Sequence, residues 1–370
     1  MRSRAVAMLC VLVLVVTGCG GKKGGGGPQT TELEVTASDT ACTVAKTTLP
    51  AGRHTFAVTN KGTKVTEFYV YGAGDRVVGE VENVSPGLRR TLVVDLTAGQ
   101  YQAACKPGMV GDGIRTTLTV TGTAPSQATS EKLAAAVQSY RQYVQGQADS
   151  LVTQTAAFVA AIKAGDIDKA KSLYPVVRTP YERIEPVAES FGDLDPKIDA
   201  REDDVEAGTP WTGFHRLEKD LWAGVRPDPA VADQLTKDVA ALKEQVGKVE
   251  LTPLELANGA KELLDEVAGS KLTGEEDRYS HTDLWDFQAN VEGSKAAVAA
   301  LRPYVDERDS TLGRTLDERF AMVQAELSKY RSGDGFVGYQ TLSKDQVKAL
   351  SDALNGLGEP VSKVAAVVAK

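Results

Sequence analysis

The chain changes its hydrophobic periodicity once, and this change constrains the fold more than any other feature. Residues 31–122 contain short runs, rich in Thr and Val, in which apolar and polar residues alternate. Runs of this kind, separated by Gly, Pro, Asn or Lys, are typical of half-buried strands, and their close spacing predicts a β-sandwich. The predicted strands cover residues 31–37, 54–60, 65–71, 77–84, 88–96, 100–105 and 114–121.

After a linker of small residues at 123–130, Ala, Leu and Val recur with the period of an amphipathic helix. The predicted helices cover residues 131–147, 149–164, 166–190, 211–224, 230–249, 253–269, 281–304, 310–330, 343–355 and 360–369. A block of strands followed by a block of helices indicates separate domains and not a mixed α/β sheet. The sequence therefore predicts a β-sandwich at 31–122 and an all-α domain at 131–370.

The N-terminus is typical of an exported lipoprotein. Residues 1–18 begin with Arg2 and Arg4 and continue through an apolar run that ends at a lipobox-like site before Cys19. That run is shorter than the ~20 residues of a membrane-spanning helix. We therefore expect a signal peptide at 1–18, a lipid on Cys19 and a flexible glycine-rich tether at 19–30. The expected location is extracytoplasmic, with the lipid anchored in the cell membrane.

The net charge indicates which partners suit the chain. Loss of the signal peptide removes Arg2 and Arg4, so the formal net charge changes from −8 to −10. Nucleic-acid binding needs a basic surface that neutralises phosphates, so we expect no nucleic-acid partner. An acidic protein is better suited to binding cations.

A first pair of potential metal ligands is formed by His215 and Glu218. They lie three residues apart, in a stretch where Phe214, Leu217 and Leu221 mark the buried face of a helix. The two side chains project from the same side of that helix and can share one metal ion. The alternative is a histidine that is hydrogen-bonded in the core.

Further carboxylates lie on both sides of this pair in the sequence. Glu182 and Glu185 also stand three residues apart, and the facing helices of metal-binding bundles commonly carry such residues. Asp199 belongs to an acidic stretch between the two pairs, and Glu276 to a third acidic cluster. For each of these residues the alternative is a solvated acidic surface. In that third cluster, we interpret Asp283 as the N-cap of a helix.

Several separated motifs together resemble the imelysin-like domain of the EfeO-type iron-uptake lipoproteins. The resemblance covers roughly residues 130–370 and is carried by residues 181–189, 193–204, 215–222 and 280–287. It implies a pair of four-helix bundles with a metal site at His215 and Glu218. It also implies that this site draws on Glu182, Glu185, Asp199 and Glu276.

The segment from Gly99 to Met109 resembles the ligand loop of cupredoxins, and this second resemblance covers the predicted sandwich. A blue-copper site needs two histidines in addition to cysteine and methionine. The predicted sandwich has only His54, and Glu67 stands where a second histidine is expected. We therefore do not expect electron transfer through a blue-copper centre.

Two cysteines remain in the expected mature chain beyond Cys19, namely Cys42 and Cys105. One interpretation is a structural disulfide, which is typical of an exported protein. The other, which the resemblance to EfeO-type proteins also implies, is a copper or iron site of Cys42, Glu67 and Cys105, with Met109 as a further ligand. The sequence leaves both interpretations open.

The ligand types indicate the function. Imidazole with carboxylates suits iron or manganese better than copper(I). We expect an anchored protein that binds ferrous or ferric iron and passes it to an iron permease, and the resemblance also implies a haem peroxidase partner. One alternative is a zinc-dependent peptidase of the imelysin-like class, although Lys219 stands where the motif His-x-x-Glu-His needs a histidine. Another is a surface-interaction lipoprotein with a vestigial metal site.

Overall fold

The structure is a computed structural model that describes residues 32–123, 130–191, 194–205, 208–269 and 271–370. The predicted signal peptide, Cys19, the tether and most of the predicted linker lie outside these residues. Among the helices of the described part, none combines the length and the apolar character needed to cross a membrane.

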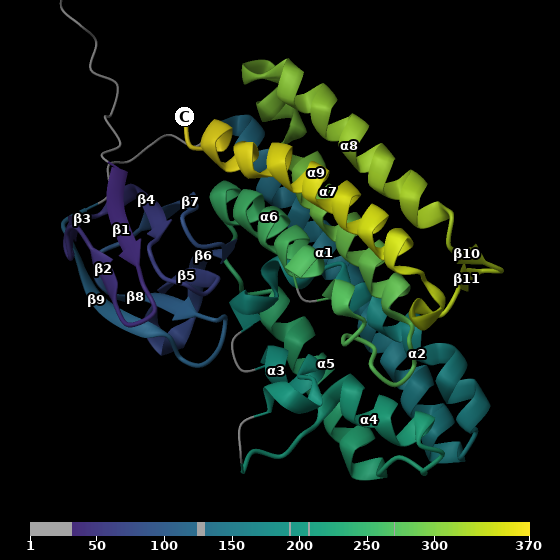
Figure 1. Cartoon of the computed structure of the whole chain (residues 1–370). Coiled ribbons are helices and arrows are strands. Elements are labelled where there is room, and N and C mark those ends of the chain that lie inside the picture. The colour runs from purple at the N-terminus through teal and green to yellow at the C-terminus, as the bar shows by residue number, and fades with distance from the viewer. Residues whose placement is uncertain (1–31, 124–129, 192–193, 206–207, 270) are drawn as a thin grey trace, which may run out of the picture. The chain divides into compact units, whose positions relative to one another are not determined.

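The N-terminal domain is a sandwich of two sheets (Figure 1). One sheet has the strand order β2-β1-β4-β7 and the other has the order β3-β9-β8-β5-β6. The strands are β1 Glu32–Ala37, β2 Cys42–Val44, β3 Thr48–Pro50, β4 Gly52–Asn60, β5 Thr66–Tyr71, β6 Val77–Val84, β7 Arg89–Leu96, β8 Gly99–Pro107 and β9 Ile114–Thr121.

The alternation of apolar and polar residues explains which side of a strand is buried. In β1, Leu33, Val35 and Ala37 are buried while the residues between them are exposed, as expected for one face on a core. Phe56 of β4 and Phe68 of β5 bring the two sheets together, with ring centroids 5.5 Å apart. Strands β2 and β3 were not predicted from the sequence, because strands of three residues are too short to show alternation.

The second domain is helical, so the predicted combination of a β-sandwich and an all-α domain is confirmed (Figure 1). Its α-helices are α1 Glu131–Ala164, α2 Ile167–Glu182, α3 Leu194–Asp199, α4 Gly213–Trp222, α5 Pro229–Val246, α6 Pro253–Gly269, α7 Asp283–Arg308, α8 Ser310–Ser328 and α9 Lys344–Val368. Short 3₁₀ segments lie at Glu185–Phe191, Glu202–Asp204, Lys271–Thr273 and Tyr339–Thr341, and a two-stranded ribbon joins Arg331–Ser332 to Gly335–Phe336.

These helices pack as two groups of four. In the first group α1, α2, α4 and α5 contact one another in a ring, and in the second group α6, α7, α8 and α9 do the same. Helices α1 and α2 also contact α7, and one continuous hydrophobic core runs through both groups. This arrangement agrees with the pair of four-helix bundles that the resemblance implies.

The structure corrects several predicted boundaries. Helix α1 continues through residue 148, because Tyr140, Val144, Leu151 and Phe158 keep one buried face across the predicted break. Helix α9 likewise continues through Pro360. The acidic stretch that contains Asp199, for which no helix was predicted, forms α3 and a 3₁₀ turn.

Candidate metal centre

Helix α4 places His215 and Glu218, and its first residue fixes how the helix enters the domain. Gly213 has a φ of +87°, and a Cβ atom there would lie 2.3 Å from the carbonyl oxygen of Ile198. Only glycine tolerates both conditions. The consequence is that α4 starts directly against the end of α3, which brings His215 close to Asp199.

His215 is buried and its two ring nitrogens face different partners. Nδ1 lies 3.1 Å from Oε2 of Glu218 and 3.3 Å from the hydroxyl of Tyr174. Nε2 lies 3.6 Å from Oδ1 of Asp199 and 3.8 Å from Oε1 of Glu276. When the ring is neutral, a proton on Nδ1 satisfies Glu218 and leaves the Nε2 lone pair facing the two other carboxylates.

Backbone amides hold Glu218 in place. Its Oε1 accepts hydrogen bonds from the amides of Tyr279 at 3.0 Å and Ser280 at 2.7 Å. Burial alone raises the pKa of Glu218, but the hydrogen bond from His215 and the amide of Ser280 outweigh it and lower that pKa below its usual value. The segment before α7 therefore keeps Glu218 ionised beside His215.

Asp277 completes the same side of the site. Its Oδ1 accepts a hydrogen bond from the Tyr174 hydroxyl at 3.0 Å and lies 4.0 Å from Nδ1 of His215. Its other oxygen accepts from Thr282. Thr282, and not Asp283, is the N-cap of α7, so our N-cap interpretation of Asp283 was wrong by one residue.

Arg178 lies in the middle of this group and is completely buried. Its guanidinium contacts Asp199 and Glu182, lies 3.1 Å from Glu276 and 3.5 Å from Asp286, and donates to Nε2 of His215 at 3.2 Å. Arginine keeps its charge in any environment. The carboxylates therefore already share one fixed positive charge.

Lys271 is a second buried cation in this group. Its Nζ lies 3.0 Å from Glu182, 2.8 Å from Glu185 and 3.6 Å from Glu276. Asn290 donates to Glu182 at 2.9 Å and to Glu185 at 2.6 Å. Glu185 therefore forms an ion pair with Lys271 and accepts a hydrogen bond from Asn290, at the edge of the site.

We use the term carboxylate cage for Glu182, Glu185, Asp199, Glu218, Glu276, Asp277 and Asp286 together with His215, Arg178 and Lys271. Its seven carboxylates outnumber its two fixed cations. Lys271, His215 and Arg178 offset the effect of burial and lower the pKa of Glu276 to about 2, whereas burial raises that of Asp199 to about 7. Burial also raises the pKa values of Asp277 and Asp286. The excess negative charge is thus compensated in part by bound protons.

Three groups of potential ligand atoms converge in the carboxylate cage. In each group the atoms lie within 4.8 Å of one another: Asp199, His215 and Glu276; His215, Glu218 and Asp277; Glu182, Glu276 and Asp286. His215 and Glu276 each belong to two groups. A carboxylate oxygen of Asp286 is buried with no hydrogen-bond partner among the described residues. An oxygen-rich set with one imidazole is the donor chemistry that iron or manganese takes.

The structure therefore brings together most of the residues predicted from the sequence. Glu182, Asp199, His215, Glu218 and Glu276 all lie in these groups, while Glu185 lies beside them. The roles of Arg178, Asp286 and Lys271 were not predicted from the sequence. The spacing of Arg178 and Glu182, four residues apart on one helix face, was a usable signal for the first of these. No comparable signal marks Lys271.

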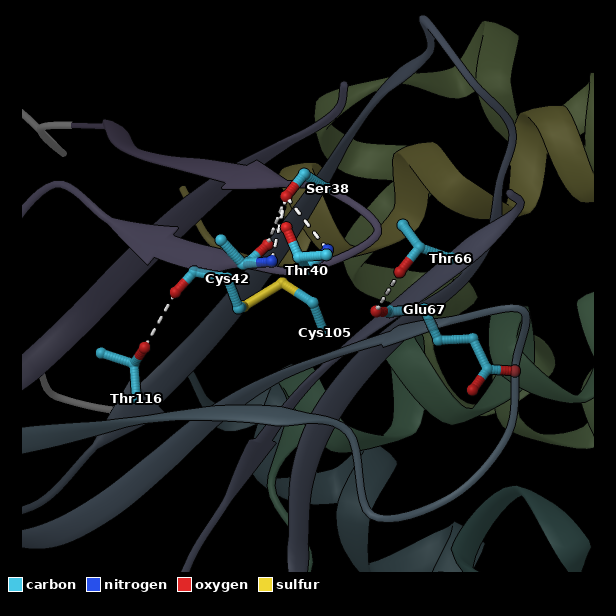
Figure 2. Close-up of a disulfide and its surroundings, with 8 residues drawn as sticks. Ser38, Thr40, Cys42, Thr66, Glu67, Cys105 and Thr116 are labelled. Atoms are coloured by element: carbon cyan, nitrogen blue, oxygen red, sulfur yellow. Dashed lines mark hydrogen bonds between the residues drawn. A yellow bond between two sulfur atoms is a disulfide. The ribbon is translucent and has the colours of Figure 1, made fainter. Parts of the chain in front are cut away.

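In the sandwich, Cys42 and Cys105 form a disulfide with an S–S distance of 2.00 Å (Figure 2). Sulfurs bonded in this way are not thiolate ligands, so the structure has the disulfide of our two interpretations and not the thiolate site. Figure 2 also shows the Glu67 carboxylate pointing away from the disulfide. Glu67 and Met109 instead line a separate cavity. His54 is buried and its Nε2 lies 2.8 Å from the carbonyl oxygen of Pro50.

Comparison with known proteins finds a matching family profile for each of the two domains. The imelysin family profile matches residues 136–364, and the profile of the cupredoxin-like domain matches residues 7–120. The iron uptake system component EfeO of Escherichia coli O1:K1 is 41% identical over 346 residues, which covers 91% of each chain. The chain belongs to the EfeO family. The proteins of the same name from Escherichia coli K12 and Shigella flexneri show the same identity and coverage.

The chain also matches a solved structure, the dithionite-reduced auracyanin of Roseiflexus castenholzii. The match covers 26% of this chain and all of that one, with 16% identity and a TM-score of 0.21. A likeness this slight supports no argument about the site, so the family assignment rests on the sequence relatives.

Proposed function

We propose that this chain is an extracytoplasmic, lipid-anchored component of an iron-uptake system, and that it binds iron in the carboxylate cage for transfer to a permease. The observation that carries the proposal is the convergence of three ligand groups on His215 and Glu276 in a buried site with surplus negative charge. The relatives are named iron uptake system components, which supports iron as the ion carried.

The chemistry of binding follows from the charges. Asp199 holds a proton near neutral pH, because burial raises its pKa to about 7. An ion that enters must displace such protons and must compete with Arg178 for Asp199 and for Nε2 of His215. Iron binding should therefore release protons. Because protons compete directly with the ion, binding should weaken as the pH falls below about 7.

The room at the site favours an ion over a peptide. A cavity of about 10 Å³ borders His215, Glu218 and Glu276. One water or one ion fills a space of this size, since a single water needs roughly 10–15 Å³. A peptidase must also expose its general base to the scissile bond, whereas Glu218 is fully buried and accepts two backbone hydrogen bonds. These observations support a binding protein over the zinc-peptidase alternative.

Calorimetric titration with Fe(II) under anaerobic conditions tests the proposal. His215→Ala and Glu218→Gln should each lower the affinity at least tenfold while circular dichroism stays unchanged. His281→Asn and Glu318→Gln are matched controls, because neither residue belongs to a ligand group. Repeating the titration in buffers with different ionisation enthalpies measures the released protons. Full affinity in a folded His215→Ala, Glu218→Gln double variant would overturn the iron assignment, and peptide cleavage that depends on Glu218 would favour the peptidase.

The anchoring rests on the sequence alone, since Cys19 lies outside the described residues. Cys19→Ala should move the protein from the detergent phase to the aqueous phase in a partitioning assay. Unchanged partitioning would refute lipid anchoring and leave the iron site untouched. A permease and a haem peroxidase are the partners we propose, and co-purification of the anchored wild-type chain with each tests them.

A further inference from the structure

Tyr174 is a buried tyrosine whose hydroxyl faces the carboxylate cage. It lies on α2, four residues before Arg178, so both side chains project from the same face of that helix. Its side chain is completely buried and packs against Phe158 and Trp222, with ring centroids 6.2 and 5.5 Å away. This packing holds the hydroxyl in one direction, toward the cage.

The hydroxyl oxygen of Tyr174 contacts two members of one ligand group. It donates to Oδ1 of Asp277 at 3.0 Å and lies 3.3 Å from Nδ1 of His215. Those two ligand atoms are 4.0 Å apart, and Oε2 of Glu218 lies 3.1 Å from the same ring nitrogen. Tyr174 therefore adds a fourth potential ligand atom to the group of His215, Glu218 and Asp277.

The spacing of these atoms matches that of ligands around one metal ion. The hydroxyl oxygen of Tyr174, Oδ1 of Asp277 and Nδ1 of His215 form a triangle with sides of 3.0, 3.3 and 4.0 Å. The point equidistant from its three corners lies roughly 2.0 Å from each of them, and first-row metal ions bind oxygen and nitrogen at about 2.0–2.2 Å. One ion at this point therefore reaches all three atoms without a large movement of any side chain.

We propose that Tyr174 is a further iron ligand, and that its phenolate makes this side of the cage selective for Fe(III) over divalent ions. The proposal rests on the iron binding proposed above and adds the oxidation state of the ion. The phenolate and the carboxylates of Glu218 and Asp277 carry three negative charges, and the imidazole is neutral. These four ligands together neutralise a trivalent ion, whereas a divalent ion leaves one buried negative charge uncompensated.

Binding exchanges one proton of Tyr174 for the ion. In the metal-free chain burial and the charges of Asp277 and Glu218 raise the pKa of Tyr174 well above its ordinary value, so the hydroxyl is protonated and donates to Asp277. Fe(III) replaces the O–H bond by an O–Fe bond, and the proton passes to solvent. A divalent ion attracts the phenolate less strongly, so the hydroxyl keeps its proton and does not serve as its ligand.

His215 offers one nitrogen to each of two ligand groups. An ion beside Tyr174 takes the lone pair of Nδ1, and the ring proton then lies on Nε2, which is 3.6 Å from Asp199. Arg178 donates to Nε2 in the metal-free chain, and it keeps Asp199 and Glu182 as acceptors when the proton moves there. The Nε2 side of the ring remains available to divalent ions that need no phenolate.

Visible absorption of the iron-loaded chain tests the proposal, because a phenolate bound to Fe(III) gives an intense charge-transfer band that carboxylate and imidazole ligands do not give. The full chain is titrated with Fe(III) nitrilotriacetate, and separately with Mn(II) as the divalent comparison. The wild type should develop the band. Tyr174→Phe should lose it and bind Fe(III) at least tenfold more weakly, while its Mn(II) affinity changes less than threefold.

Tyr140→Phe is the matched control. Tyr140 is also buried, on α1, and its hydroxyl has no hydrogen-bond partner among the described residues. This variant should keep both the band and the Fe(III) affinity. Fe(III) binding without a band, or a band that survives in Tyr174→Phe, would overturn the tyrosine ligand and leave the proposed iron site intact. A wild-type chain that binds neither Fe(III), Fe(II) nor Mn(II) would overturn both proposals.

Circular dichroism checks that each variant folds. If Tyr174→Phe does not fold, Tyr181→Phe and Tyr279→Phe decide, because the hydroxyls of these two tyrosines contact Asp195 and Glu202 beside the cage. Retention of the band in both variants, together with its loss in His215→Ala, would uphold Tyr174 as the ligand. Loss of the band in Tyr181→Phe or in Tyr279→Phe, or its retention in His215→Ala, would overturn it.

Discussion

Replacing Lys271 by Met tests whether the buried lysine competes with the metal ion. Met keeps most of the volume of the side chain and removes its charge. In the metal-free protein the change leaves Glu182, Glu185 and Glu276 without their common partner, at 3.0, 2.8 and 3.6 Å respectively. Breaking a buried ion pair by removing one partner costs about 3–5 kcal/mol, so we expect the free energy of unfolding to fall by that amount.

The same change should strengthen metal binding. Lys271 lies 3.6 Å from Oε1 of Glu276, and Nε2 of His215 lies 3.8 Å from the same atom. A divalent ion lies about 2 Å from its ligand atoms, so an ion bound to these two ligands lies at most about 6 Å from the ammonium group. At an effective dielectric constant of about 20 their repulsion is then at least roughly 5 kcal/mol. Protonation of the carboxylates that lose Lys271 offsets part of this gain in binding free energy. A tenfold increase in affinity corresponds to about 1.4 kcal/mol, and we expect at least that much at pH 8.

Urea unfolding of the metal-free protein measures the first effect, and calorimetric titration with Mn(II), which does not oxidise under these conditions, measures the second. Lys261→Met is the matched control, because Lys261 lies on α6 and pairs with Asp265 in a partly exposed position. This control should change neither the free energy of unfolding nor the free energy of Mn(II) binding by more than about 1 kcal/mol. If Lys271→Met lowers stability but leaves the Mn(II) affinity unchanged or weaker, Lys271 positions the ligands and does not compete with the ion.

Two further predictions concern the disulfide and a buried acid. Replacing Cys42 and Cys105 by Ala opens a loop of 63 residues and should lower stability by about 4 kcal/mol in urea unfolding of the metal-free chain, with iron binding at the cage retained. An equal stability of the variant and the oxidised wild type would contradict a structural disulfide. Burial and the nearby charge of Asp277 raise the pKa of Asp283 from 3.8 to about 8. Ionising Asp283 therefore destabilises the fold as the pH rises through this window, so Asp283→Asn should gain stability over the wild type between pH 4 and 8, by at most about 1.4 kcal/mol per pH unit, and level off above pH 8. A difference independent of pH would show that Asp283 titrates normally.

The sequence by itself determined the architecture and predicted the residues at the centre of the candidate site. The change from alternating to helical periodicity separates the sandwich from the helices. Alternating apolar residues share one face only in a strand, and apolar residues with a period of 3.6 share one face only in a helix. The spacing of His215 and Glu218 fixes their common direction, because residues three apart on a helix lie on one side. Likewise, the apolar neighbours of His215 in the sequence predict its burial, which the structure shows.

Tertiary structure decided which charges meet. Asp199, Arg178 and Lys271 come from a short helix, a long helix and a 3₁₀ turn, and no local pattern specifies that they share the space around Glu182 and Glu276. The close approach of α3 and α4 depends on the left-handed backbone at Gly213, which the sequence permits without indicating. The position of Glu67 was likewise open, since this ligand was expected beside the two cysteines, whereas its carboxylate points away from the disulfide and the residue lines a separate cavity. Charge pairing across distant segments follows from packing. Burying Arg178 and Lys271 costs desolvation free energy, and the burial of apolar side chains throughout the domain offsets this cost. Residues next to the two cations in the chain therefore do not specify their partners.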